Sequence, residues 1–390
     1  MNILIVTETY PPEINGVART LAQMVSGLSK LGHRITLVCP KQKQRPSDDE
    51  PAEIHPVRGL PLPGYPGLQF GMPAGGLIKR LIAHKQIDAC YIATEGPLGH
   101  SAMRACHRAG VPCLSGMHTN FHQYSGHYNA GMLAPALWRY LRGFHNKLAG
   151  TLVPTGAMAD ELEDSGFRNL HVWPRGVHAN LFSPDRRNEE LRARWGIGSD
   201  DIVVVYVGRL APEKNIDTTF EAFSAIRERH PTARMVLVGN GPAEKRLRAT
   251  HPEAIFAGPR TGVELAEYYA SGDMFLFSSV TETFGNVTLE AMASGLAVVS
   301  YDLAAAHELI NHGHNGLLAP ADDKAAFIQH SLDCAGDAAL RQTLKVHARE
   351  TALQQDWPKL IDRLEKLFLA VQREATVDDR ENTATSTERP

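Results

Sequence analysis

Two carboxylates, Glu282 and Glu290, stand eight positions apart in a segment that could bind a ligand. The apolar run 274–279 before them predicts a buried strand, and helix-forming residues follow the loop 283–286. In a parallel sheet this turn lies at the carboxyl end of a strand, where ligands bind. Amides at a helix start suit a phosphate, whereas carboxylates suit the hydroxyl groups of a sugar and a ribose. The combination predicts a nucleotide-sugar site, with two solvated acids at a helix start as the alternative.

A second loop, residues 208–216, carries two cations after another apolar strand, Ile202-Val-Val-Val-Tyr-Val. Arg209 and Lys214 could neutralise a diphosphate and stabilise it as a leaving group. A surface turn with solvated charges is the alternative interpretation. A third loop, residues 9–17, follows the first strand, and its Gly16 has no Cβ, so the backbone can approach a ligand closely.

These segments resemble glycosyltransferase family 4, a family of retaining enzymes with the GT-B fold. The signature is a Glu, seven residues and a second Glu, within a Thr-Phe-Gly loop followed by Ala-Met-Ala-Ser-Gly. Gly208-Arg-Leu-Ala-Pro-Glu-Lys214 resembles the family's diphosphate motif, and the Gly16 loop resembles its first glycine loop. The resemblance covers nearly all of residues 1–373.

The resemblance implies roles for individual residues. Arg209 and Lys214 would hold the diphosphate, and Glu290 the ribose hydroxyls. Glu282 would hold the transferred sugar together with the amides of three loop residues, which are Phe284, Gly285 and Asn286. Gly16 and Arg260 would complete the donor site.

Four further residues come from one segment of the first half of the chain. His118 resembles the family histidine that faces the transferred sugar, and a hydrogen bond from it to a sugar hydroxyl or the departing oxygen would aid catalysis. His122, Tyr124 and His127 follow as candidate acceptor-side residues.

The order of elements predicts an α/β protein with two Rossmann-like, doubly wound parallel sheets that face each other across a cleft. Strand and helix alternate in both halves, beginning with a β-α-β unit over residues 2–39. The expected domains are 1–183 on the acceptor side and 184–355 for the nucleotide sugar, with 174–200 as a linker. A terminal helix, 356–374, would cross back to the first domain, as the resemblance implies, and the polar tail 375–390 should be disordered.

Composition narrows the function classes. The chain has 390 residues, a formal net charge of −3 and 43% hydrophobic residues, which excludes a disordered chain and argues against a nucleic-acid partner. The charge is uneven, +5 over residues 1–183 and −8 over the rest. A basic first half fits an anionic membrane surface or an anionic substrate, and chance is the alternative. The helix expected at 132–148 fits either an interfacial segment with Trp138 as anchor or a packed core helix.

Targeting and metal signals are weak. Five cysteines without a Cys-x-x-Cys pair predict small core residues rather than disulfides or a zinc site. No apolar stretch approaches 18 residues, so we expect a cytoplasmic protein, with peripheral contact at the inner face of the membrane as one interpretation. No Asp-x-Asp is flanked by apolar residues, so neither a metal nor another cofactor is expected.

The predicted function is transfer of a hexose, with GDP-mannose favoured, to a lipid, lipid-linked or other glycan acceptor. The resemblance is strongest to GDP-mannose-dependent α-mannosyltransferases and to sulfoquinovosyl- or glucosyl-diacylglycerol synthases, so a UDP-sugar donor with diacylglycerol as acceptor is the first alternative. A nucleotide-sugar 2-epimerase on the same fold and a catalytically inactive binding module are the others.

Overall fold

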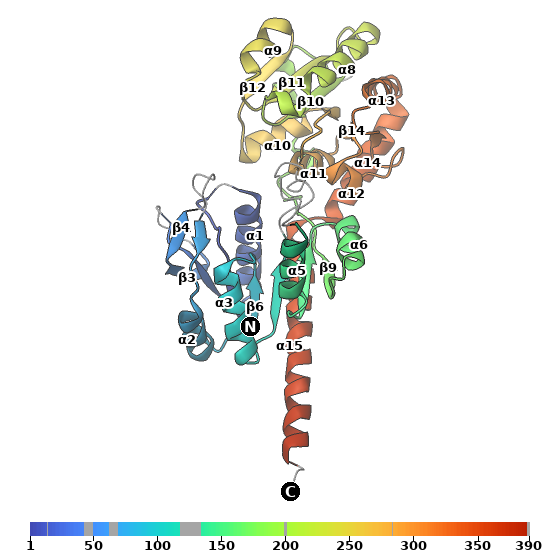
Figure 1. The fold of residues 1–390 in the computed structure, drawn as a ribbon. Helices are drawn as coiled ribbons and strands as arrows, with labels where there is room; N and C mark the ends of the chain where they lie inside the picture. The colour runs from blue at the N-terminus through green and yellow to red at the C-terminus, as the bar shows by residue number, and fades with distance from the viewer. Residues whose placement is uncertain are drawn as a thin grey trace. The chain divides into compact units, whose positions relative to one another are not determined.

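The computed structural model describes residues 1–13, 15–42, 50–61, 69–117, 134–198, 201–282 and 284–387, with side chains up to residue 377. The chain forms two compact units (Figure 1). The first comprises residues 1–174 together with 358–390, and the second comprises residues 175–357.

The first unit contains a seven-stranded parallel sheet in the order β3-β2-β1-β6-β7-β8-β9. Its strands are β1 (Asn2–Val6), β2 (Arg34–Pro40), β3 (Ala52–Val57), β6 (Ala89–Ile92), β7 (Cys113–Gly116), β8 (Gly150–Val153) and β9 (Leu170–Val172). The helices between them are α1 (Gly16–Lys30), α2 (Gly75–Lys85), α3 (Pro97–Arg108), α5 (Ala134–His145) and α6 (Gly156–Asp164). A short antiparallel ribbon, β4 (Gly59–Pro61) with β5 (Gln69–Gly71), precedes α2.

The second unit contains a six-stranded parallel sheet in the order β12-β11-β10-β13-β14-β15. Its strands are β10 (Val203–Val207), β11 (Arg234–Val238), β12 (Ile255–Gly258), β13 (Met274–Phe277), β14 (Ala297–Tyr301) and β15 (Leu317–Ala319). Its helices are α7 (Glu189–Arg194), α8 (Ile216–Arg229), α9 (Glu244–Thr250), α10 (Gly262–Ala270), α11 (Asn286–Ala293), α12 (Ala304–Leu309), α13 (Lys324–Gly336) and α14 (Ala338–Gln354), with short 3-10 turns at η1 (Pro184–Arg186) and η2 (Pro212–Lys214).

Each sheet has one point at which the strand order reverses. In the first sheet the chain runs from β1 outward to β3 and then returns to β6 on the other side of β1. In the second sheet it runs from β10 to β12 and returns to β13 beside β10. The loops that leave neighbouring strands in opposite directions open a crevice there, so ligands bind at such points.

The terminal helix α15 (Trp357–Thr387) packs on the first unit. The indole nitrogen of Trp173 donates to the Leu360 carbonyl (2.9 Å), and His33 pairs with Glu365 at 2.8 Å. Gly27 of α1 is needed for this contact, because a Cβ there would lie 2.5 Å from the Ile361 side chain. The helix is assigned through Thr387, and the disorder expected for 375–390 stays a prediction. No glycine or proline interrupts the sequence before Pro390, and its polar residues are compatible with an extending helix.

The segment 174–200 is not a free linker in its described part. Most of it belongs to the second unit, where α7 begins at the Asn188 cap and buries Leu191 and Trp195 in the core. Its charged residues suggested solvent exposure, but Arg192 is fully buried by specific partners.

The inner face of α5 packs against the first unit, as the packed-helix interpretation predicts. Leu141 and Phe144 are buried, and Trp138 meets the Phe167 ring edge-on. Leu137 and Tyr140 stay exposed. Among the described residues no helix is both long and apolar enough to cross a membrane.

Candidate active site

The two loops at the reversal point of the second sheet are joined by an ion pair. Lys214 ends the turn after β10, and Glu282 lies in the loop after β13. The Lys214 ammonium lies 2.6 Å from a Glu282 carboxylate oxygen and donates to the Thr281 carbonyl at 2.9 Å. Both side chains are 18% exposed, so solvent screening is reduced but access to a ligand remains. Two of the predicted site residues therefore meet.

Hydrogen bonds between the same loops hold this pair in place. The Thr281 hydroxyl donates to the Glu213 carbonyl (2.9 Å), and the Ser278 hydroxyl donates to the Asn215 carbonyl (2.7 Å). Tyr206 lies beneath them, with its hydroxyl 3.3 Å from the Arg209 carbonyl. Burial, followed by the negative charges of Glu282 and Glu213, raises the pKa of Tyr206, so the phenol stays protonated. The lysine is therefore positioned by a supported loop and not by its own pair alone.

Glu290 lies on α11, as predicted, and its carboxylate is oriented by a tyrosine from the preceding helix. The Tyr269 hydroxyl donates to Glu290 at 2.9 Å. Tyr269 is fully buried, and its ring meets that of Phe182 edge-on at 5.7 Å. Burial, with Glu290 as the next contribution, raises the Tyr269 pKa. Nothing in the local sequence distinguishes Tyr269 from its neighbour Tyr268, so this partner could not be predicted.

The start of α11 presents backbone amides. Gly285 caps the helix in the left-handed region, at φ 86°, which favours glycine. Phe284 anchors the loop, because its ring is buried and its carbonyl accepts from Ala305 at 2.6 Å. The amides of Phe284, Gly285 and Asn286 donate to no acceptor in the described part of the chain. These amides could donate to an oxygen ligand, and their predicted role in holding the sugar stays a prediction.

The other two predicted donor cations have different surroundings. Arg209 is 66% exposed and pairs with Glu213 one turn further on, at 3.3 Å. Arg260 follows the edge strand β12, pairs with Glu264 at 3.1 Å and lies over the Tyr268 ring. Two strands, β11 and β10, separate β12 from β13 in the sheet. Arg260 is thus engaged with its own helix, and no contact among the described residues brings it to the Lys214–Glu282 pair.

The predicted residues of the first unit are only partly described. Gly16 is the first residue of α1, and the Asn15 side chain caps that helix by accepting from the Ala18 amide at 2.8 Å. The Asn15 amide group also donates to Thr9, which donates to Glu13, so the loop is internally bonded. His118, His122, Tyr124 and His127 lie outside the described residues.

Two carboxylates at the reversal point of the first sheet were not predicted. Glu8 follows β1, and Glu95 follows β6. Burial raises the pKa of Glu8 to about 7, with an opposing hydrogen bond from the Gly71 amide and a further increase from Glu95. Glu95 accepts from the buried His145, at 3.2 Å, and His145 in turn contacts the Ser115 hydroxyl at 2.8 Å. The sequence signal that could have identified both residues is a polar side chain directly after a buried strand.

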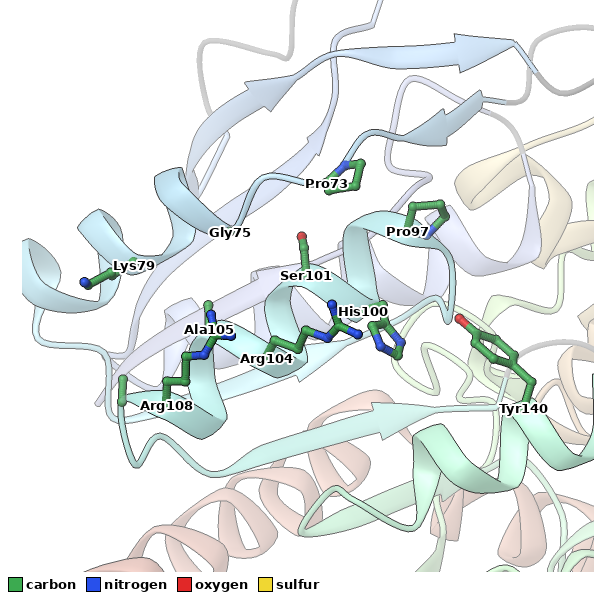
Figure 2. Close-up of a pocket in the computed structure, with 11 residues that line it drawn as sticks. Pro73, Gly75, Lys79, Pro97, His100, Ser101, Arg104, Ala105, Arg108 and Tyr140 are labelled. Carbon is green, nitrogen blue, oxygen red and sulfur yellow. The ribbon is translucent and has the colours of Figure 1, made fainter.

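A groove of about 730 Å³ runs along α3 between α2 and α5 (Figure 2). Its described lining includes three exposed cations, Lys79, Arg104 and Arg108, and no carboxylate. His100 and Tyr140 stack near one end, with ring centroids 6.2 Å apart. Neither the spacing of these residues nor their types distinguished them in the sequence.

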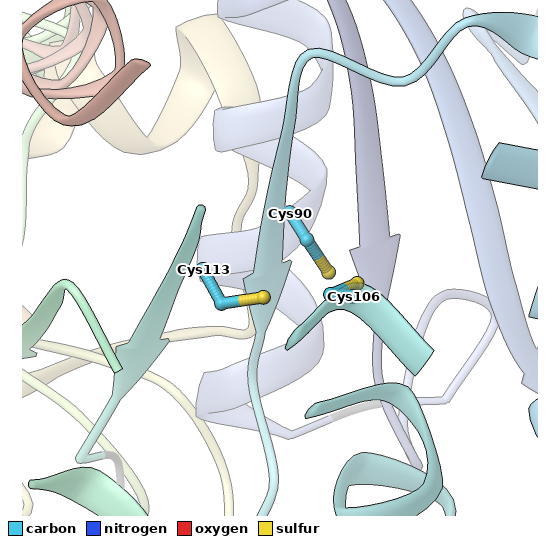
Figure 3. Close-up of side chains that lie close together, drawn as sticks. All are labelled: Cys90, Cys106 and Cys113. Carbon is cyan, nitrogen blue, oxygen red and sulfur yellow. The ribbon is translucent and has the colours of Figure 1, made fainter. Parts of the chain in front are cut away.

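The five cysteines are free and buried, as expected for small core residues. Three of them, Cys90, Cys106 and Cys113, bring their sulfur atoms within 4.8 Å of one another (Figure 3). This trio is the one group with metal-ligand geometry among the described residues. It lies within the apolar core under α3, apart from the residues of both sheet edges.

Comparisons with known proteins agree with the architecture. The family model described as Glycosyltransferase Family 4 matches residues 14–181, and the model described as Glycosyl transferases group 1 matches residues 201–337. Among solved structures, that of Anabaena HepE in complex with UDP is similar with a TM-score of 0.73 at 19% identity, over 95% of this chain and 100% of that one. At this identity the likeness supports the fold alone.

Two curated relatives are similar over most of their length. A GDP-mannose-dependent alpha-mannosyltransferase from Mycobacterium tuberculosis is 33% identical over 96% of this chain and 98% of its own length. An alpha-monoglucosyldiacylglycerol synthase from Streptococcus pneumoniae is 27% identical over 82% of this chain and 75% of its own.

Proposed function

This chain belongs to glycosyltransferase family 4, and we propose that it transfers mannose from GDP-mannose to a lipid or lipid-linked acceptor with retention of configuration. It is a hexosyltransferase with two parallel-sheet α/β units of the GT-B type. The observation that carries the donor site is the Lys214–Glu282 pair, which joins the two loops at the reversal point of the second sheet.

Each donor group has a matching partner in this proposal. Lys214 and Arg209 take the diphosphate, and they stabilise the charge that develops on it as the glycosidic bond breaks. Glu290, held by Tyr269, accepts hydrogen bonds from the ribose hydroxyls. Glu282 and the amides at the start of α11 hold the sugar hydroxyls. The acceptor hydroxyl attacks from the face that the diphosphate leaves, and a phosphate oxygen takes its proton.

Lys214 has a double role in this mechanism. Its ammonium has three donors, of which one contacts Glu282 and another the Thr281 carbonyl. A third N–H is sufficient for a phosphate oxygen. The lysine would therefore contact both the leaving diphosphate and the carboxylate that positions the sugar. This fixes the position of the diphosphate relative to the sugar while the bond between them breaks.

The donor and the acceptor are assigned from the relatives. The mycobacterial relative is named for GDP-mannose, and its identity spans both units. The streptococcal relative is named for a diacylglycerol product, which supports a lipid acceptor and keeps a UDP-sugar donor as the second candidate. Both relatives are transferases, so the epimerase hypothesis gains no support. We further propose peripheral contact with the cytoplasmic face of the membrane, where lipid acceptors are found, and catalysis without a metal ion.

A screen of nucleotide sugars tests which nucleotide base the donor carries. Thermal unfolding is measured with GDP-mannose, UDP-glucose and ADP-glucose, with EDTA present in a parallel series. Ligand at about 100 times its Kd stabilises the folded state by about 2.7 kcal/mol, so the correct base should stand out. A shift with UDP-glucose alone would replace GDP by UDP, and loss of the donor-induced thermal shift in EDTA would contradict metal-free donor binding.

The variant Glu282→Gln tests the site. It keeps the shape of the side chain but removes the charge that pairs with Lys214 and accepts from the sugar. We expect kcat to fall on the order of 100-fold, as for other single preorganised groups. The midpoint of thermal unfolding should change little, because the pair is partly exposed.

Glu228→Gln is the matched control, since Glu228 is exposed on α8 away from both loops. It should keep full activity. Near-normal turnover of Glu282→Gln would overturn the site, and donor binding without turnover in the unmodified protein would instead favour a binding module.

A further inference from the structure

The groove along α3 carries a charge that the donor site does not use. Arg104 and Arg108 lie one turn apart on α3, and Lys79 lines the same groove from α2 (Figure 2). Within the described residues none of the three cations forms an ion pair or hydrogen bond. The groove therefore holds uncompensated positive charge.

The groove's own histidine responds to this charge. Burial lowers the pKa of His100, and the positive charges of Arg104 and Lys147 lower it further. Its Nδ1 atom is buried and has no hydrogen-bond partner within the described residues. The one N–H of the imidazole can donate a hydrogen bond to an oxygen ligand, and the positive potential of the groove favours an anion.

The lining residues on α3 form a row that runs from an uncharged end to a charged end. Pro97, His100, Arg104 and Arg108 recur at helical spacing along one face of α3. Pro97 begins the helix at the carboxyl edge of the first sheet, just after Glu95. At 1.5 Å per residue, Arg104 lies about 10 Å further along the helix axis. The uncharged end of the groove is thus at the ligand edge of the sheet, and its cations are set back from it.

We propose that this groove binds the phosphate group of the lipid acceptor's headgroup, with Arg104, Arg108 and Lys79 as its partners. This inference rests on the proposed lipid acceptor and makes that acceptor a phosphate-bearing lipid. Guanidinium groups bind phosphate oxygens in bidentate geometry, which makes arginine suited to this task. A neutral diacylglycerol would leave three cations without a partner. The headgroup hydroxyl that accepts the sugar would then point toward the carboxyl edge.

The test measures binding of the full chain to sedimented vesicles. The vesicles contain phosphatidylcholine alone, phosphatidylcholine with diacylglycerol, or phosphatidylcholine with phosphatidylglycerol. We expect binding to the phosphatidylglycerol vesicles only. The double variant Arg104→Gln with Arg108→Gln should bind them roughly 20- to 30-fold more weakly, at about fivefold per cation near an anionic surface.

The control is Arg34→Gln with Arg80→Gln, which removes the same charge from exposed positions of the same unit that do not line the groove. Its affinity for the vesicles should stay within about threefold of that of the unmodified protein. Removing charges outside the groove lowers only the general electrostatic attraction, whereas removing charges in the groove also removes direct contacts with the phosphate. Equal weakening of the two double variants would overturn the groove as a site. Equal binding to the diacylglycerol vesicles would overturn the claim that the groove recognises a phosphate group.

Two further measurements separate the possible failures. Inorganic phosphate is titrated in a thermal-unfolding assay, and a response to it without vesicle binding would overturn the lipid as the source of the phosphate. Stabilisation by GDP-mannose is measured for both double variants and should be unchanged. If the unmodified protein shows no response to any nucleotide sugar, the proposed function fails, whatever the vesicles show.

Discussion

At the scale of single residues, carboxylates at strand ends have opposite environments in the two units. Glu282 is matched by the ammonium of Lys214 at 2.6 Å. Glu8 has no cation partner within the described residues, and it packs against Gly96, where a Cβ would lie 2.1 Å from the Glu8 carboxylate oxygen. Burial without a counter-charge favours the protonated carboxyl. Glu8 is therefore a group whose charge changes near neutral pH.

The variant Glu8→Gln should make stability less dependent on pH. The folded-state pKa of Glu8 is raised from 4.5 to about 7, so the folded protein binds the proton more tightly than the unfolded chain. The stability from this proton is complete below pH 4.5 and is lost as the pH rises to about 7. At pH 8 the variant should be more stable than the unmodified protein by up to about 3.4 kcal/mol, at 1.36 kcal/mol per pKa unit.

Urea unfolding at pH 8 and at pH 4.5 measures the difference between the two proteins. The gain should shrink toward zero at the lower pH. A difference that is equal at the two pH values would show that Glu8 is ionised in the folded state throughout. Glu50→Gln is a comparison in the same unit, at a carboxylate that accepts from the Tyr10 hydroxyl at 2.7 Å.

At the scale of elements, the short helix α7 secures the start of the second unit through a buried charge. Arg192 donates to Asp273 at 3.0 Å and to the carbonyls of Ser271, Gly198 and Asp201. Its side chain is 1% exposed. These bonds tie α7 to the turn before β13, the strand that leads into the Glu282 loop. The segment therefore supports the donor site even though its residues are polar.

Replacing Arg192 with methionine should cost about 3 kcal/mol of folding free energy, because Asp273 would lose its nearest cation and keep only Arg187 at 3.4 Å and Lys345 at 3.8 Å. Urea unfolding of the second unit, followed by hydrogen exchange of β10 and β13, measures the loss. Arg194→Met is the control, since Arg194 is exposed on the same helix. Similar stabilities of the two variants would show that the Arg192–Asp273 pair is dispensable.

At the scale of the whole molecule, the two compact units are not two continuous stretches of chain. The chain completes the second unit at residue 357 and then adds α15 to the first. Leu360, Ile361, Leu364 and Phe368 of α15 are buried there. The first unit is therefore complete only after α15 has been synthesised.

Phe368→Ala should destabilise the first unit specifically. Removal of a fully buried phenylalanine side chain costs about 3–5 kcal/mol. Hydrogen exchange should quicken in β1, β8 and β9 and stay unchanged in β10 and β13. Lys366→Ala, at a side chain that is 71% exposed, should change neither set. Faster exchange spread over both sheets would contradict the assignment of α15 to the first unit.

Much of the fold could be read from the chain because its signals are local. Strands such as Ile202–Val207 are continuous apolar runs, and the helix over 16–30 repeats its apolar residues every three or four positions. The same locality applies to Glu282, Lys214 and the α11 loop, since residues directly after buried strands fall at the ligand edge of a parallel sheet. The strands β3 and β15 were not predicted, because they have six and three residues and are partly exposed. The 11-residue helix α2 was not predicted either, and only Ile78 and Leu81 of it are buried.

The sequence by itself determined the family, the alternation of strand and helix, and the residue types at the donor loops, because all three are written in contiguous motifs. Only the tertiary structure decided that Lys214 pairs with Glu282, that Tyr269 orients Glu290, and that Arg104, Arg108 and Lys79 share one groove. Those contacts join side chains from different elements, and their energies depend on burial and on distances that no local pattern encodes. For the same reason Arg192 looks like a solvated charge in the chain and is a buried one in the fold.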